Sequence, residues 1–280
     1  MTTAFVLGGG GVLGAVEVGM LRALLERDIV PELVLGTSVG ALNGAMVARQ
    51  PELAVVERLT ELWAATARSR EVYGDRPLRT VRRAVSTGTH IYSSKPLRQR
   101  LEAELGDTTF EDLPVRLGVC AASIERSAEH WFMTGPLVPA ILASAAVPGL
   151  LPPAQIDGEH FLDGGLVNSV PVGKAVELGA TRVFVLQVGR IDRPLAAPTR
   201  PWEVARVSFE VARRHRFMRD MATIPEGVEA HVLPAAGTSA RDDSLLAHRD
   251  FSSVQTRIDA TYDASRRYLD EALGSSSRPR

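Results

Sequence analysis

Short apolar runs alternate with longer segments of helical periodicity over the first third of the chain. Ala4–Leu7 and Glu32–Leu35 are short and almost wholly apolar, which predicts two buried strands. Apolar residues recur at helical spacing in Ala15–Arg27, Val39–Arg49 and Glu52–Arg68, which predicts three helices. This strand–helix–strand–helix order is typical of a parallel sheet covered by helices.

The rest of the chain carries the same two patterns less regularly. Strands are predicted at Val115–Ile124, Glu129–Met133, Arg182–Val188 and Val228–Leu233, and helices at Pro139–Val147, Pro171–Leu178 and Phe251–Leu273. Asp157-Gly158 is a turn signal between apolar pieces and predicts a hairpin that ends at Phe161-Leu162. No new strand–helix series follows the proline-rich Arg190–Pro201, so we expect one domain over residues 1–273 and a disordered tail over 274–280.

Composition narrows the class of protein. The chain has 280 residues, of which 45% are hydrophobic and 23% charged, which excludes collagen-like, coiled-coil and largely disordered chains. The net charge of −1 argues against a dedicated nucleic-acid binder. Cys120 is the single cysteine, which fits a reducing compartment, and its apolar surroundings predict a small buried side chain.

One long stretch without charge, Trp131–Ile156, imitates a membrane span. Prolines interrupt it repeatedly, whereas a spanning helix needs about 20 unbroken apolar residues. We interpret it as a short buried helix followed by a loop. The first basic residue is Arg22, so no secretory signal is indicated. We therefore expect a soluble cytoplasmic protein.

Two basic regions have two interpretations. Between Arg68 and Arg100 there are nine Lys or Arg residues against two acidic ones, and five arginines interleave with apolar residues between Arg206 and Arg219. Such segments form ordinary solvated faces, and they also lie on anionic membrane surfaces. Peripheral contact with the inner surface of the membrane stays open.

Three glycine-containing clusters carry candidate chemistry. Gly8–Gly14 joins the first predicted strand to the first helix, where glycines present backbone N–H groups beside a helix N-terminus. Gly36–Gly40 joins the second strand to the second helix and fits the nucleophile elbow G-x-S-x-G, with Ser38 between Gly36 and Gly40. Asp163-Gly164-Gly165 puts a carboxylate at the end of a predicted strand.

A dinucleotide site is the alternative for the first cluster. Gly9, Gly11 and Gly14 satisfy the G-x-G-x-x-G pattern. That site also requires an acidic residue at the end of the second strand, and this chain has Gly36-Thr37-Ser38 there. We do not expect nucleotide binding.

A nucleophilic Ser38 needs a base, and two kinds are available. His215, His231 and His248 lie downstream, as in Ser-His-Asp hydrolases, but none follows a strand in a loop, and His231 lies inside a predicted strand. Asp163 is the other base. A carboxylate is a weak base, so an oxyanion hole would then supply much of the rate, each donor on the order of 3 kcal/mol.

Phe5–Leu21, Gly36–Ala45 and Ala143–Val172, in this order, resemble the patatin-like phospholipases. The resemblance implies a three-layer α/β/α fold with a mainly parallel sheet. It also implies hydrolysis of acyl esters of lipids by a dyad of Ser38 and Asp163, an oxyanion hole at Gly9, Gly10 and Gly11, and no cofactor or metal. The uncharged Leu137–Leu151 is a candidate wall of an acyl-chain groove, with core packing as its other interpretation.

Two positions depart from the family pattern. Leu13 stands where the glycine loop usually carries Lys or Arg. The stretch after the aspartate usually reads N-x-P with a second asparagine, and here it is Asn168-Ser169-Val170-Pro171. Two alternatives remain beside the dyad hydrolase: a Ser-His-Asp esterase, and a non-catalytic protein that binds lipid or membrane.

Overall fold

The computed structural model describes residues 1–69, 89–189, 194–236 and 254–274. The strands are β1 (Thr3–Leu7), β2 (Leu33–Thr37), β3 (Arg116–Ser123), β4 (Ala128–Phe132), β5 (Ala154–Ile156), β6 (Glu159–Asp163), β7 (Arg182–Leu186) and β8 (Glu229–Val232). The α-helices are α1 (Ala15–Leu25), α2 (Val39–Arg49), α3 (Ala54–Ser69), α5 (Lys95–Leu105), α6 (Leu137–Ser144), α7 (Gly165–Asn168), α8 (Val172–Glu177), α9 (Pro201–Ala222) and α10 (Val254–Gly274). Two short 3₁₀ turns, Gly11–Gly14 and Phe110–Asp112, complete the described elements.

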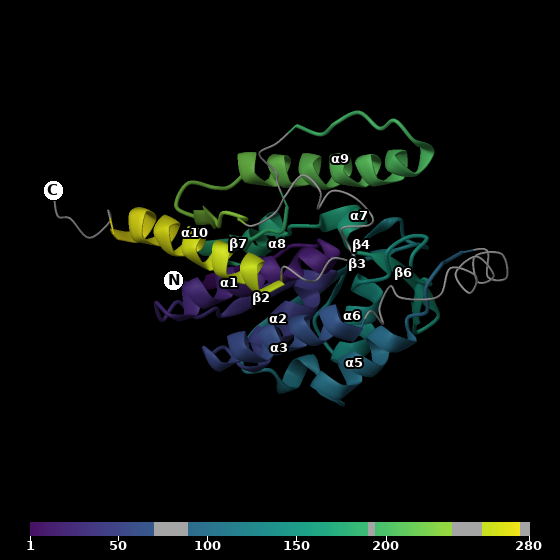
Figure 1. Ribbon diagram of the computed structural model, residues 1–280, viewed down its shortest axis with the longest axis horizontal. Coiled ribbons are helices and arrows are strands. Elements are labelled where there is room, and N and C mark those ends of the chain that lie inside the picture. The colour runs from purple at the N-terminus through teal and green to yellow at the C-terminus, as the bar shows by residue number, and fades with distance from the viewer. Residues whose placement is uncertain (70–88, 190–193, 237–253, 275–280) are drawn as a thin grey trace.

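The side chains of the central strand β1 alternate between the two faces of the sheet, and each face is covered by helices, which gives three layers. Phe5 and Leu7 point into one core, which they share with α1, α2, α3 and α10, whereas Ala4 and Val6 point into a second core with α8 and α9. Figure 1 shows α9 on the opposite side of the sheet from α1, α2 and α3. The expected three-layer α/β/α architecture is confirmed.

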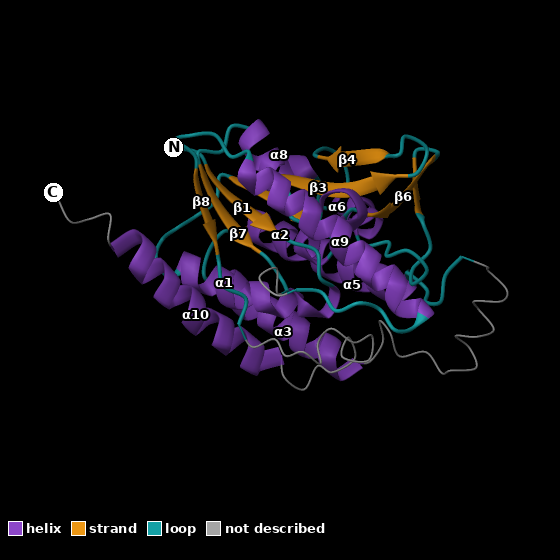
Figure 2. Cartoon of the chain, turned by 90° about the horizontal axis from the view of Figure 1, so that it is seen from above, coloured by secondary structure: helices purple, strands orange, loops and turns teal. Residues whose placement is uncertain are grey.

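The sheet is mixed, with a parallel majority. Strands β3, β2, β1, β7 and β8 are parallel neighbours in that order, whereas β4 and β6 pair antiparallel with β3, and β5 pairs antiparallel with β6. Figure 2 shows the strands of this sheet, in orange, seen from the side of α9. The predicted hairpin around Asp157-Gly158 is β5–β6.

Two strands approach each other end to end along one edge of β3. In the register of β2, Thr37 lies opposite Cys120, and in the register of β6, Asp163 lies opposite Ala121. Both β2 and β6 use this edge because β4 occupies the other one over the same residues of β3. The ends of β2 and β6 therefore meet at the middle of β3.

Most predicted elements are confirmed, with ends that differ by a few residues. The stretch Trp131–Ile156 contains the short buried helix α6, as expected, and Cys120 is fully buried. None of the described helices combines the length and apolarity that crossing a bilayer requires. Most of the basic region Arg68–Arg100 and the start of the predicted helix Phe251–Leu273 lie outside the described residues, as does nearly all of the predicted tail.

Candidate active site

Ser38 occupies a strained turn between β2 and α2. Its backbone has φ 56° and ψ −121°, a left-handed conformation that costs a serine on the order of 1–3 kcal/mol. Neighbouring groups hold it there. The Ser38 N–H donates to Ser144 Oγ at 2.7 Å, and its carbonyl accepts from the N–H of Ala41 at 3.0 Å.

The two glycines of the elbow are required by close packing. A Cβ on Gly36 would lie 2.4 Å from the carbonyl oxygen of Gly40, and a Cβ on Gly40 would lie 2.3 Å from the carbonyl oxygen of Leu7. Both contacts are far shorter than any real Cβ contact. The elbow therefore closes on itself only with glycine at position 36 and packs against β1 only with glycine at position 40.

The structure brings Ser38 and Asp163 together. Ser38 Oγ donates a hydrogen bond to Asp163 Oδ2 at 2.6 Å, across 125 positions of sequence. The other carboxylate oxygen, Oδ1, accepts the N–H of Gly165 at 2.7 Å. The two side chains meet because β2 and β6 end at the same point on β3. Gly164 lets the chain leave that point, since a Cβ there would lie 2.2 Å from the carbonyl oxygen of Cys120.

Burial tunes the basicity of Asp163. The residue is only 2% exposed, and desolvation raises its pKa from 3.8 to about 6, although the hydrogen bonds from Ser38 and Gly165 oppose the rise. A carboxylate with a pKa near 6 is a better proton acceptor than an ordinary aspartate, and it is still mostly ionised at pH 7.

Sequence reasoning missed Ser144, which supports both members of this pair. Its Oγ accepts the N–H of Ser38 and donates to the carbonyl of Cys120 at 2.6 Å, and its carbonyl accepts the N–H of Gly164 at 3.2 Å. The end of α6 thus fixes the ends of β2 and β6. The available signal was a serine within an otherwise apolar stretch.

The glycine loop lies beside Ser38, and its backbone N–H groups differ in whether they already have a hydrogen-bond acceptor. A Cβ on Gly9 would lie 3.4 Å from Ser38 Cβ, so the loop is in contact with the nucleophile. The Gly9 N–H donates to the carbonyl of Ser169 at 2.9 Å. Among the described residues, no protein acceptor receives the N–H of Gly10 or Gly11. These two amides are the ones available to a ligand.

A buried polar network, also missed from the sequence, anchors the far end of this loop. Asn43 Nδ2 donates to the carbonyl of Gly14 at 3.0 Å and to Glu17 Oε2 at 2.7 Å, and Trp63 Nε1 donates to Asn43 Oδ1 at 3.2 Å. Burial raises the pKa of Glu17 well above its usual range, which favours the neutral acid. The network ties the loop to α2 and α3.

The structure gives the candidate histidines other surroundings. His231 lies in β8, where its ring stacks on Phe184, and His215 is exposed on α9. His248 lies outside the described residues. Within the described ranges, no histidine bonds to Ser38 or Asp163, and no group of three or more His, Cys, Asp or Glu residues could hold a metal ion.

The basic segment Arg206–Arg219 is part of α9, and two of its arginines bond to groups outside the helix. Arg213 is 6% exposed and donates to the carbonyls of Gly9 and Val188, and Arg216 pairs with Asp220 and Glu129. The stretch Leu137–Leu151 begins with α6, whose apolar side chains pack into the core, in line with its core interpretation.

Comparison with known proteins identifies similar chains. A family model described as patatin-like phospholipase matches residues 5–176. The patatin-like phospholipase domain-containing protein ZK370.4 of Caenorhabditis elegans is 36% identical over 191 residues, 67% of this chain and 14% of that protein. Lysophospholipase nte1 of Aspergillus terreus is 30% identical over 192 residues, 68% of this chain and 12% of that protein.

A solved structure, that of VipD from Legionella pneumophila, covers 96% of this chain and 67% of its own, with a TM-score of 0.49 and 14% sequence identity. The chain spans only 12–17% of the length of the curated relatives that it matches.

Proposed function

Since the chain belongs to the patatin-like phospholipase family, we propose that it is a serine acyl hydrolase that cleaves carboxylic ester bonds of lipids. The observation that carries the proposal is the 2.6 Å hydrogen bond from Ser38 Oγ to Asp163 Oδ2 at a strained turn beside the glycine loop.

The geometry supports a two-step reaction. Ser38 Oγ attacks the ester carbonyl carbon while its proton passes to Asp163 Oδ2, and the carbonyl oxygen becomes an anion beside the glycine loop. The N–H groups of Gly10 and Gly11 stabilise that anion, whereas Gly9 shapes the loop through its bond to Ser169. Asp163 returns the proton to the leaving alcohol. A water molecule then attacks the acyl carbon while its proton passes to Asp163, the bond to Ser38 Oγ breaks to release the carboxylic acid, and Asp163 returns the proton to Ser38 Oγ.

The pH dependence of hydrolysis tests this proposal. Only ionised Asp163 accepts a proton, and burial raises its pKa to about 6. We expect kcat/KM for a p-nitrophenyl acyl ester to be level above about pH 7 and to fall about tenfold per pH unit well below pH 6. Absence of hydrolysis, or a profile that stays level down to pH 4.5, would contradict the proposal.

Histidine variants separate this proposal from a Ser-His-Asp esterase, which would also lose activity in acid. Replacing His215, His231 and His248 one at a time with glutamine leaves the dyad intact, so turnover should persist in all three. Loss of turnover in one folded variant would favour the histidine mechanism.

We also propose that the protein meets lipid aggregates with the outer face of α9. Val204, Val211 and Met218 are 50%, 53% and 60% exposed, and residues seven apart share one helix face. We assign this apolar face to contact with aggregated lipid. The opposite face of the same helix packs beside Asp163 through Phe209 and Gly165, so a lipid surface bound to α9 would lie close to the candidate active site.

Vesicle binding tests that surface. The double variant Val211→Asp/Met218→Asp should weaken binding to anionic phosphatidylglycerol vesicles about tenfold or more, because it replaces apolar contacts with charge. Leu53→Asp, at a comparably exposed apolar residue away from α9, is the control and should bind as the wild type does. Equal binding by both variants would overturn the assignment of this face.

A further inference from the structure

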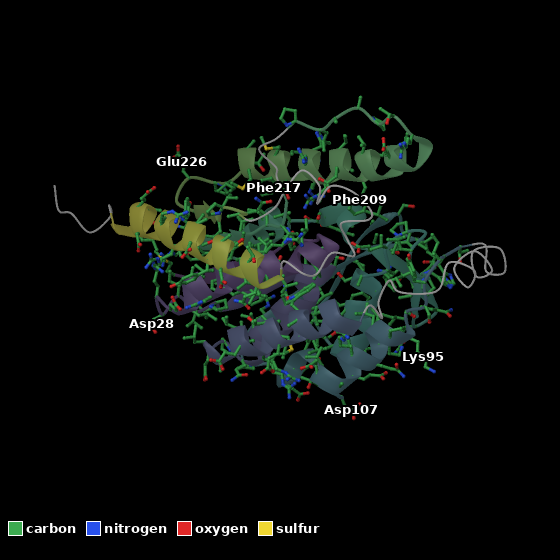
Figure 3. The ribbon with its side chains drawn as sticks, viewed as in Figure 1. Asp28, Lys95, Asp107, Phe209, Phe217 and Glu226 are labelled. Carbon is green, nitrogen blue, oxygen red and sulfur yellow. The ribbon has the colours of Figure 1, made fainter. Side chains whose placement is uncertain are left out.

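The inner face of α9 reaches both halves of the candidate active site. Figure 3 shows Phe209 and Phe217 pointing from α9 toward the rest of the molecule. Phe209 lies against Gly165, where a Cβ would be 2.7 Å from Phe209 Cζ, and Gly165 holds Asp163 Oδ1. Arg213 lies one helical turn from each phenylalanine and therefore on the same face.

Arg213 donates two hydrogen bonds to backbone carbonyls beside the nucleophile. Its Nη1 donates to the carbonyl of Gly9 at 3.1 Å and to the carbonyl of Val188 at 3.2 Å, and its Nη2 donates to Glu210 Oε2 at 3.2 Å. The bonds to Gly9 and Val188 join the loop after β1 to the segment after β7. Val188 also packs on this loop, since a Cβ on Gly10 would overlap its Cγ2.

Burying the charged guanidinium of Arg213 destabilises the fold unless other groups neutralise its charge and accept its hydrogen bonds. Arg213 is 6% exposed, and a guanidinium out of water needs an opposite charge and hydrogen-bond partners. Nη1 and Nη2 have such partners, whereas Nε is buried without a hydrogen bond. Glu210 supplies the opposite charge. No charged side chain occurs within Gly8–Gly14, where position 13 is leucine, so the cation at this loop comes from α9.

The hydrogen bond from Arg213 to the carbonyl of Gly9 also affects the N–H of Gly10. The carbonyl of Gly9 and the N–H of Gly10 belong to one planar peptide unit and point in opposite directions. Holding the carbonyl therefore fixes the direction of the N–H. Glycine adopts several backbone conformations at similar energy, so a Gly–Gly peptide without such a contact turns easily. The guanidinium also polarises the peptide, which makes the N–H a stronger donor.

We propose that Arg213 is the positioning residue of the oxyanion hole: by holding the carbonyl of Gly9, it keeps the N–H of Gly10 directed at the oxygen that becomes negative. This inference rests on the proposed hydrolase function. Gly9 is then held on both sides, by the Ser169 carbonyl at its N–H and by Arg213 at its own carbonyl.

Kinetics of Arg213→Met on a p-nitrophenyl acyl ester test the inference. Because the contact matters mainly when the oxyanion forms, kcat should fall about 10- to 100-fold while KM changes less than about threefold. Arg213→Lys keeps a cation and should recover part of the lost kcat. Arg219→Met, at a side chain that is 59% exposed on the same helix, is the matched control and should keep wild-type kcat.

Amide hydrogen exchange across residues 8–14 supplies a readout that does not depend on activity. Arg213→Met should speed exchange at Gly9 and Leu13, whose amides are bonded within and beside the loop, and Arg219→Met should not. Wild-type kcat in Arg213→Met, or a lowered kcat with unchanged exchange, would overturn the inference.

Two further outcomes are decided by the same measurements. If the wild type does not hydrolyse esters, the proposed function fails, and exchange alone decides whether Arg213 holds the loop. If Arg213→Met does not fold, Arg213→Lys decides: a lowered kcat with faster exchange supports the inference, and wild-type values for both overturn it.

Discussion

Replacing Ser38 with alanine is expected to lower hydrolysis of a p-nitrophenyl acyl ester by about 10⁴-fold or more, to the background rate. The change removes only Oγ, which is the attacking atom and the donor to Asp163 Oδ2. The backbone contacts of the turn, to Ser144 Oγ and from Ala41, do not involve that atom and remain. The fold should therefore persist, as circular dichroism and thermal melting would verify.

A fluorophosphonate probe makes this test specific to one serine. The probe should label Ser38 in the wild type and no serine in Ser38→Ala. Ser127 offers a matched control, because it is a second serine with positive φ, at 50°, on an exposed turn. Ser127→Ala should keep both labelling and turnover. Turnover that survives in a folded Ser38→Ala variant would end the proposal of a serine nucleophile.

Asp163→Asn should lower kcat/KM by about 10³- to 10⁴-fold at pH 8, because an amide cannot accept the proton of Ser38. Asparagine has nearly the same shape, and its oxygen can still accept the N–H of Gly165. Asp157→Asn is the control, since Asp157 lies in the β5–β6 turn, exposed and with φ 50°. Its activity should be that of the wild type. Retained activity in Asp163→Asn would exclude Asp163 as the base.

The Asp163→Asn variant should be more stable toward unfolding than the wild type in alkaline solution. Folding raises the pKa of Asp163 from 3.8 to about 6, so the fold favours the protonated carboxyl. The stability that this group contributes is complete below about pH 4 and is lost as the pH rises through 6. The loss is on the order of 3 kcal/mol. A neutral asparagine avoids it, so the melting temperature should rise by several degrees at pH 8 and the gain should shrink toward pH 4.

Local patterns predicted most of the strands and helices and the place of Ser38 at a turn between two of them. The apolar runs before Gly8 and Gly36 mark β1 and β2, and the G-x-S-x-G spacing places Ser38 at the following turn. These features depend on a few neighbouring residues, which is why the sequence reveals them. The family pattern added Asp163, which local chemistry alone left as one of two bases.

Features that depend on distant contacts were not predicted. The supporting role of Ser144 follows from the packing of α6 against two strand ends, and nothing beside it in the sequence indicates that role. The helix α9 was predicted only as a basic segment, because Arg213 and Asp220 interrupt the apolar stripe on its inner face. Arg213 bonds to the backbone of Gly9 and Val188, which lie far away in sequence, and no local pattern shows that Asp220 is buried.

The meeting of β2 and β6 on one edge of β3 has a consequence for how related chains can vary. Insertions or deletions in the long stretch between Ser38 and Asp163 leave the reacting atoms in place as long as they fall in loops. An extra residue between Cys120 and Ala121 would instead lengthen β3 at the point where β2 and β6 end. It would move the ends of these two strands apart by about 3.3 Å. Chain length can therefore vary in the loops between the two residues, but not at the middle of β3, a strand that supplies neither of them.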